Sequence, residues 1–295
     1  MKTALHSVSY SGLIPGQHAL TLHQFIDKAA DLGFDGVMLA GKRPHASVLD
    51  MTAAVRREVR QHLEDRGLAL ACIAGYNNFS ADAEHPDIPT REMQIQHLTE
   101  LARLAHDLGG DKVRVFTAYE VPQWSFRQTW DSVVACLREC ARRAADFGVT
   151  IGVQNHHDLA VHWRSLRDLL QEVNEPNCRA MFDAWSPGLQ GDDLALAARE
   201  MAPWTCHTTV ADYARRPRFK YDPNLVNYTR QPDLIQAVPM GEGFLDYDGF
   251  LRGLREGGYD GFVAYEMCSP LQGGGSEANL DRYARRFLEY MAPWR

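Results

Sequence analysis

The sequence contains no long apolar run, no concentrated basic tract and no paired cysteine motif. No segment reaches the roughly 18 consecutive apolar residues that a membrane-spanning helix requires, and residues 1–16 show neither the apolar core nor the cleavage site of a secretory signal. The six cysteines are Cys72, Cys136, Cys140, Cys178, Cys206 and Cys268. Because none forms a Cys-x-x-Cys pair, we expect buried free thiols and a protein of the reducing cytoplasm with no membrane partner.

Two further classes of partner are disfavoured by the sequence. The net charge of −7 gives little attraction to a phosphate backbone, so nucleic acid is not an expected partner. No Gly-x-Gly-x-x-Gly segment follows the first apolar run, which argues against a dinucleotide-binding domain.

What the sequence does contain is an alternation of short apolar, β-branched runs with longer helical patterns. The predicted strands are Ala4–Ser9, Gly36–Leu39, Ala69–Ala74, Lys112–Thr117, Thr150–Gln154, Ala180–Phe182, Cys206–Val210 and Gly261–Tyr265. Apolar stripes with helical spacing lie between them, such as Leu22, Phe25, Ile26 and Ala29. This pattern favours a closed parallel (βα)8 TIM barrel. With 295 residues, 45% of them hydrophobic, the chain is predicted to form one domain over residues 1–295.

Two predicted connections are unusually long, residues 76–89 and residues 211–246. The second contains a cluster of basic residues interspersed with aromatic ones. Connections of this length in a compact domain are usually lids or binding elements. A contact between the subunits of a homodimer is the alternative interpretation.

Polar residues gather where the predicted strands end, on the face where TIM barrels hold their active sites. Asp183 and Glu266 each directly follow an apolar strand, where a carboxylate is costly unless it is paired, hydrogen-bonded or bound to metal. With Gln154 and a histidine they offer oxygen and nitrogen ligands for a divalent ion. A hydrogen-bonded polar layer is the structural alternative, and His207 is equally well explained as a buried core histidine.

Five segments, taken in chain order, resemble motifs of the sugar phosphate isomerase/epimerase family, whose members have a xylose isomerase-like TIM barrel. The segments begin at Thr150 (TIGVQNH), Met181 (MFD), His207 (HTTVADY), Pro239 (PMGEGFLDY) and Gly258 (GYDGFVAYE). They are similar to the family's fifth-strand "ALENH" motif, its sixth-strand aspartate, its "HxHxKDY" and "PxGEGxxDY" motifs, and its final strand with a glutamate. The resemblance covers most of the chain.

The resemblance implies a divalent metal ion, Mn²⁺, Mg²⁺ or Zn²⁺, held at the ends of the fifth to eighth strands. The family's four ligand positions fall here on Gln154, Asp183, Thr209 and Glu266, and an earlier family histidine falls on His207. We therefore predict Gln154, Asp183, His207 and Glu266 as metal ligands. An amide and a hydroxyl in place of a carboxylate and an imidazole are expected to weaken this site.

The same resemblance suggests a mechanism. Epimerases of the family are understood to use two glutamates on opposite faces of the substrate, and Gln154 removes one of them. We expect Glu266 to be the base, with His156 and His157 as proton donors to a leaving oxygen. One base suffices for isomerisation on a single enediolate face, or for β-elimination from a keto-sugar or keto-inositol.

Further residues near the strand ends are predicted to bind a carbohydrate. Aromatic side chains would pack against its C–H faces, and basic ones would hold a phosphate or carboxylate. The predicted substrate-binding residues are Tyr76, Asn77, Trp124, Trp185, Asp212, Arg216 and Lys220.

The leading hypothesis is an isomerase or epimerase-like enzyme that removes a proton next to the carbonyl of a sugar, keto-sugar or inosose. A lyase that dehydrates a keto-sugar by β-elimination is the first alternative. A non-catalytic sugar-binding barrel is the second. A DNA-repair endonuclease, which shares this barrel, requires several zinc ions and more ligands than the sequence offers.

Overall fold

Short apolar segments form eight parallel strands that close into a barrel in the computed structural model, which describes residues 1–295. The barrel strands are β1 (Lys2–His6), β2 (Gly36–Ala40), β3 (Ala69–Ala74), β4 (Lys112–Val115), β5 (Thr150–Gln154), β6 (Cys178–Met181), β7 (Thr205–Val210) and β10 (Phe262–Tyr265). Their order around the barrel is β1-β10-β7-β6-β5-β4-β3-β2, and β1 also pairs with β2. The predicted TIM barrel is therefore confirmed. β1 ends earlier than expected because Ser7–Tyr10 forms a 3-10 turn.

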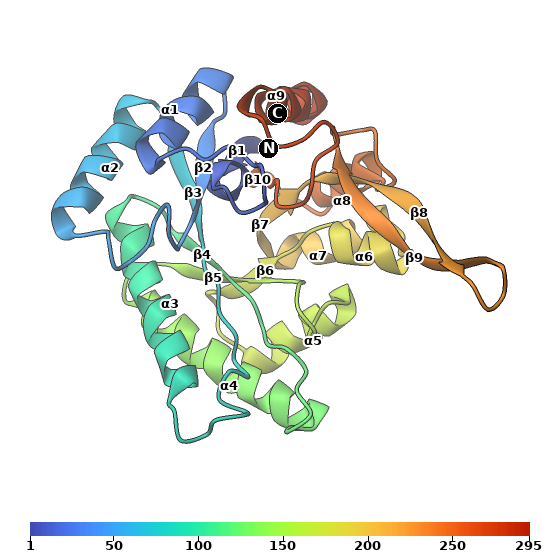
Figure 1. Cartoon of the computed structure of the whole chain (residues 1–295). Helices are drawn as coiled ribbons and strands as arrows, with labels where there is room; N and C mark the ends of the chain where they lie inside the picture. Colours follow the sequence, from blue (N-terminus) through green and yellow to red (C-terminus); the bar gives the residue numbers. More distant parts are fainter.

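Helices surround the barrel and cover its strands (Figure 1). They are α1 (Leu22–Leu32), α2 (Ala53–Asp65), α3 (Thr90–Asp107), α4 (Phe126–Ala145), α5 (Trp163–Val173), α6 (Trp185–Gln190), α7 (Leu194–Met201), α8 (Tyr247–Glu256) and α9 (Glu277–Met291). α1 begins at a capping box formed by Thr21 and Gln24. It ends at Gly33 with φ of 93°, a conformation that glycine adopts without a Cβ penalty.

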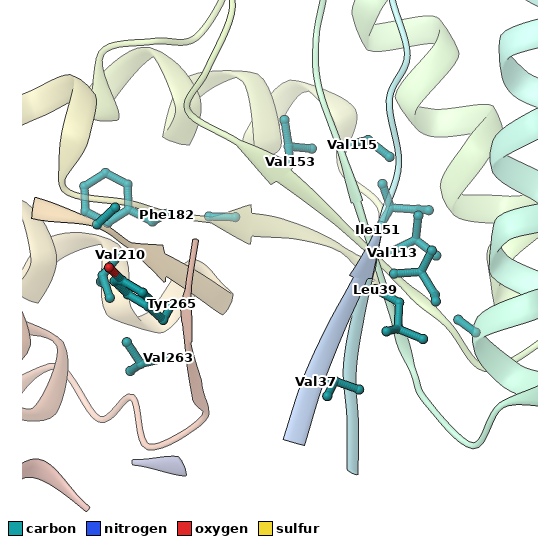
Figure 2. Close-up of a cluster of buried hydrophobic side chains, with 14 of the residues drawn as sticks. Val37, Leu39, Val113, Val115, Ile151, Val153, Phe182, Val210, Val263 and Tyr265 are labelled. Atoms are coloured by element: carbon teal, nitrogen blue, oxygen red, sulfur yellow. The ribbon is translucent and has the colours of Figure 1, made fainter. Parts of the chain in front are cut away.

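Side chains of the barrel strands alternate between the helical layer and the interior. Figure 2 shows the outward set, which includes Val113 of β4, Val153 of β5 and Val263 of β10. These residues belong to the large core between the barrel and its helices. A second, smaller cluster lies in the barrel interior and combines small side chains such as Ala4 and Ala264 with the larger Met38 and Met181. Because the alternation has a period of two, the residues that follow the outward set point into the barrel mouth.

A two-stranded antiparallel hairpin replaces most of the long loop predicted after the seventh strand. β8 (Asp212–Asp222) pairs with β9 (Asn227–Val238), and the hairpin extends away from the barrel (Figure 1). The long connection over residues 211–246 is therefore mostly regular strand rather than loop. The alternation of exposed basic and aromatic residues was the overlooked strand signal.

The cysteines follow the expectation with one exception. All six are free thiols; Cys72, Cys136, Cys140 and Cys178 are buried and Cys206 is half-buried. Cys268 is exposed, because it follows the last barrel strand at the mouth rather than lying in a core. None of the helices combines the length and the apolar character needed to cross a membrane.

Candidate active site

The carboxyl ends of the strands enclose a pocket of about 380 Å³, a volume typical of small-molecule sites. We call it the mouth pocket. Its polar lining comes from the inward-pointing positions Arg114, Gln154, Asp183, Thr209 and Glu266. Arg114, Gln154, Asp183 and Glu266 each follow an apolar core residue that faces the helices, so the same alternation that builds the core also directs these side chains inward. Asp183 and Glu266 line one cavity, as the strand-end argument requires.

Gln154 links a buried cation to a buried carboxyl group. Its side-chain oxygen accepts a hydrogen bond from Nη1 of Arg114 at 3.1 Å, and its Nε2 donates to Oδ2 of Asp183 at 2.6 Å. Both ends of the amide are thus engaged. The bond from the guanidinium fixes which end accepts, and this orientation presents the amide N–H to Asp183.

Glu266 extends from the end of β10 toward two nitrogen-bearing side chains. Its Oε1 lies 3.8 Å from Nη1 of Arg114 and 3.7 Å from Nε2 of His6. Nδ1 of His6 accepts a hydrogen bond from the backbone of Val8, so the ring proton is carried on the nitrogen that faces Glu266. Burial raises the pKa of Glu266, while the charge of Arg114 and a bond to Thr209 oppose that rise. Glu266 is therefore a largely buried acidic group held beside a cation without a close hydrogen bond to it.

Asp183 has a different environment at the end of β6. Burial raises its pKa to about 7, although the bond from Gln154 opposes the rise. Its Oδ1 accepts a hydrogen bond from the backbone of Trp185 at 3.2 Å. At neutral pH this carboxyl group therefore retains its proton in a substantial fraction of molecules.

His156 and His157 follow β5 and line the mouth pocket together. Their Nδ1 atoms lie 2.8 Å apart, and His157 adopts φ of 60°. Desolvation lowers the pKa of both rings, and the nearness of His157 lowers that of His156 further. Both are neutral at pH 7, so they can exchange hydrogen bonds with a substrate hydroxyl but are poor acids.

Aromatic rings form the walls of the mouth pocket. Tyr76 and Phe116 lie on one side, with ring centres 6.2 Å apart. Trp185 packs against Tyr213 on another side, with ring centres 4.3 Å apart. Two of the predicted substrate-binding residues, Tyr76 and Trp185, are therefore in this pocket.

Three other predicted substrate-binding residues lie elsewhere or are already engaged. The side-chain amide of Asn77 exchanges hydrogen bonds with the backbone of Phe116. Trp124 lines a separate depression in the β4–α4 connection. Asp212 is buried and accepts hydrogen bonds from the backbone of Tyr213, Gly241 and Gly243. Asn77 and Asp212 therefore hold loops in place.

The remaining predicted residues also fall outside the pocket lining. Arg216 and Lys220 lie exposed on the hairpin, where Arg216 bonds to Gln236. His207 is 1% exposed, and neither ring nitrogen has a hydrogen-bond partner. Burial lowers the pKa of His207 to about 3, so the ring is neutral. It occupies the interior position two residues before Thr209, deeper in the barrel.

The predicted ligand set does not fit a divalent metal ion. No three His, Cys, Asp or Glu side chains converge as ligands would. Gln154 directs its oxygen to the Arg114 guanidinium and its N–H to Asp183, so the amide oxygen already accepts from a cation and the amide adds no negative charge. A metal bound to Glu266 would also lie beside the guanidinium charge, 3.8 Å from that carboxylate. As arranged here, these residues do not form a divalent metal site.

Arg114 is a charged pocket residue that the polar pattern at the strand ends did not predict. It lies within β4, whereas the predicted site residues follow the strands or stand at their ends. A signal was present, because Arg114 is a single charged residue between Val113 and Val115 in a buried strand. A charge in that position is rarely buried unless it is paired.

The fold and the site together define a TIM-barrel protein with its polar residues at the carboxyl ends of the strands. The profile of the xylose isomerase-like TIM barrel family matches residues 26–291. The chain belongs to this family. The predictions of the family and of an enzyme are confirmed.

Individual relatives are distant but extend over nearly the whole chain. The sequence is 23% identical to a 3-dehydroshikimate dehydratase of Bacillus anthracis over 262 residues, which are 87% of this chain and 88% of the relative. The crystal structure of the probable 3-DHS dehydratase involved in petrobactin synthesis in that organism is similar, with a TM-score of 0.73, 21% identity, and coverage of 98% of this chain and 99% of the other.

Two epimerases show a similar fold. The D-psicose 3-epimerase of Clostridium cellulolyticum H10 aligns with a TM-score of 0.76 and 17% identity, covering 98% of each chain. The 3-keto-D-glucoside 4-epimerase of E. coli aligns with a TM-score of 0.73 and 18% identity, covering 98% of this chain and 99% of the other. At these identities the likeness concerns the fold.

Proposed function

We propose that the protein is a lyase that dehydrates a β-hydroxy ketone derived from a carbohydrate. The observation that carries the proposal is the asymmetry of the mouth pocket. Glu266 is a carboxylate beside a cation, whereas the position expected to carry a second glutamate holds Gln154, an amide engaged at both ends. A single carboxylate base suits elimination better than two-base epimerisation.

The elimination uses groups that face the same cavity. Glu266 removes the proton from the carbon next to the carbonyl, and the electron pair of that C–H bond forms an enolate. The enolate then expels the hydroxyl group on the β-carbon, which takes a proton from Asp183 and leaves as water. The pKa of Asp183, about 7, suits a proton donor near neutral pH. The product is an enone. Glu266 then loses its proton to solvent, and Asp183 takes one up from solvent.

The remaining pocket residues orient the substrate. Tyr76, Phe116 and Trp185 offer ring faces to the C–H groups of a sugar or cyclohexane ring. The neutral rings of His156 and His157 bind hydroxyl groups. The predicted carbohydrate substrate and the similarity to a 3-dehydroshikimate dehydratase both support a ring that carries a ketone and several hydroxyls.

The test is to incubate the protein in D₂O with 3-keto-glucosides, inososes and 3-dehydroshikimate. The conjugated product, an enone or, from 3-dehydroshikimate, an aromatic ring, is followed by ultraviolet absorbance, and loss of water by mass spectrometry. The Glu266→Gln variant is the inactive control, and Glu200→Gln, on the exposed surface of α7, is its matched comparison. If no substrate loses water and none incorporates deuterium, the proposal is wrong.

An isomerase or epimerase is the second candidate function. The similarity in fold to two sugar epimerases favours it, and one base can move a proton along a single enediolate face. Deuterium incorporation without loss of water in the same experiment would select this function over the lyase.

A further inference from the structure

The structure places a permanent cation in the same pocket as most of the residues that the sequence predicted to hold a divalent ion. Arg114 is 2% exposed and lines the mouth pocket between Gln154 and Glu266. Its guanidinium lies 4.2 Å from the ring centre of Phe116 and 4.7 Å from that of Tyr76. Nη2 donates to the backbone oxygen of Gly75 at 3.1 Å. These contacts fix the guanidinium plane, because each ring and each acceptor restricts a different direction.

The donors of Arg114 are only partly used. One N–H of Nη1 bonds to Gln154 and one of Nη2 bonds to Gly75, which leaves a second N–H on each; Nε is buried and has no partner. The 3.8 Å between Nη1 and Glu266 exceeds hydrogen-bond length. The guanidinium therefore retains unused N–H donors beside the proposed base. An oxygen atom of the substrate can accept a hydrogen bond from them.

The charges of the pocket are consistent with a single fixed cation. Asp183 and Glu266 are its carboxyl groups, and Arg114 lies beside Glu266 and is linked to Asp183 through Gln154. A glutamate in place of Gln154 would add a third carboxyl group and would repel Asp183 at the present 2.6 Å contact. Gln154 instead accepts from the guanidinium. Gln154 is neutral and Arg114 is positive, so the positive charge that faces the carboxyl groups comes from the arginine and no divalent ion is needed to supply it.

We propose that Arg114 supplies the electrophile of the reaction, donating to the carbonyl oxygen that becomes anionic as Glu266 removes the proton, so that turnover needs no metal ion. This inference rests on the proposed function, since it assigns the enolate oxygen of that reaction to a side chain. The charge develops next to a donor that is already in place and shielded from water, which is the condition under which such stabilisation is strongest. Lys42 lies 4.0 Å from the ring centre of Tyr76 and adds a second positive charge on this side of the site.

Two binding experiments on the purified protein test the inference without a known substrate. The first follows the electron paramagnetic resonance signal of free Mn²⁺ as protein is added, and the signal is expected to stay unchanged. The second measures by calorimetry the binding of a sugar hydroxamate, a planar enediolate mimic, in excess EDTA. We expect the hydroxamate to bind the wild-type protein, and Arg114→Met to weaken this binding by about 10- to 100-fold. Arg57→Met, at an exposed position of α2, is the matched control and is expected to bind normally.

The outcomes separate this inference from the function on which it rests. Stoichiometric Mn²⁺ binding that Asp183→Asn abolishes, with hydroxamate binding only when Mn²⁺ is present, would overturn the role of Arg114 and leave the lyase standing. Equal hydroxamate affinity in wild type and a folded Arg114→Met would also overturn it. No hydroxamate binding with or without Mn²⁺ would reject the proposed function itself. Thermal unfolding checks that Arg114→Met is folded. If it is not, hydroxamate binding to the wild-type protein in EDTA still tests whether a metal ion is required.

Discussion

The barrel mouth and the β8–β9 hairpin both carry arginine, but in opposite surroundings. Arg114 is buried, lies between two aromatic rings and has defined acceptors. Arg216 and Lys220 are exposed to solvent, and the sequence cluster that made the hairpin attractive as an anion site lines no shared pocket with the carboxyl groups. The difference teaches that the surroundings of a charge, more than the number of charges, decide whether it can do chemistry. Solvent screens the hairpin, whereas the barrel strengthens each interaction inside it.

The sharpest test of this contrast is Glu266→Gln. We expect the rate of deuterium exchange or elimination to fall by about 10²- to 10⁴-fold, because the amide cannot accept the proton. The exposed Glu200→Gln should leave the rate within about twofold, as expected for a charge that solvent screens. Equal rates in the two variants would remove Glu266 from the reaction.

Asp212→Ala tests a buried carboxylate that holds structure at the base of the hairpin. Its removal leaves the backbone N–H groups of Tyr213, Gly241 and Gly243 without their acceptor. We expect the free energy of unfolding to fall by about 3 kcal/mol. Asp233→Ala, which breaks an exposed pair with Arg230, should cost no more than about 1 kcal/mol. Urea unfolding measures both, and a smaller loss for Asp212→Ala would contradict the structural role.

His207 extends the comparison to pH. Burial lowers its pKa to about 3 in the folded protein, below the value of about 6.5 for an unfolded histidine. Its stabilising contribution is therefore complete above about pH 6.5 and is lost as the pH falls toward the folded value. Between about pH 6.5 and pH 5, we expect the wild type to lose roughly 2 kcal/mol more stability than His207→Gln does. If the free energies of unfolding of the two proteins depend on pH in the same way, the pKa of His207 is not lowered in the folded protein.

The smallest effect is expected on the hairpin. The double variant Arg216→Ala and Lys220→Ala should change KM and kcat by less than about twofold, because screened charges contribute little. Steady-state kinetics on the substrate identified above measures this. A KM raised tenfold or more would mean that the hairpin closes over the pocket during turnover, and the contrast between the two regions would fail.

The barrel was predictable because each strand has a local sequence signal, an apolar run such as Thr150–Gln154, and apolar stripes with helical spacing lie between these runs. The places of Asp183 and Glu266 followed from the same pattern, since the residue after a strand in a parallel barrel faces the mouth. Arg114 escaped because its importance depends on which side chains face it from β3, β5 and β10. The roles of Asn77 and Asp212 depended on loop backbones, whose paths only the folded structure provides.

The pairing of Lys2–Leu5 with Phe262–Tyr265 governs when this protein becomes competent during its synthesis. The first strand to leave the ribosome must wait for the last, and at about 5–20 residues per second that interval is roughly 10 to 50 s. Glu266 follows the closing strand directly, so a nascent chain that stops short of β10 has neither a sealed barrel nor its proposed base. We therefore expect incomplete chains to be inactive. Their β1 and β7 edges lack the β10 partner and are open to aggregation, so we expect such chains to bind chaperones.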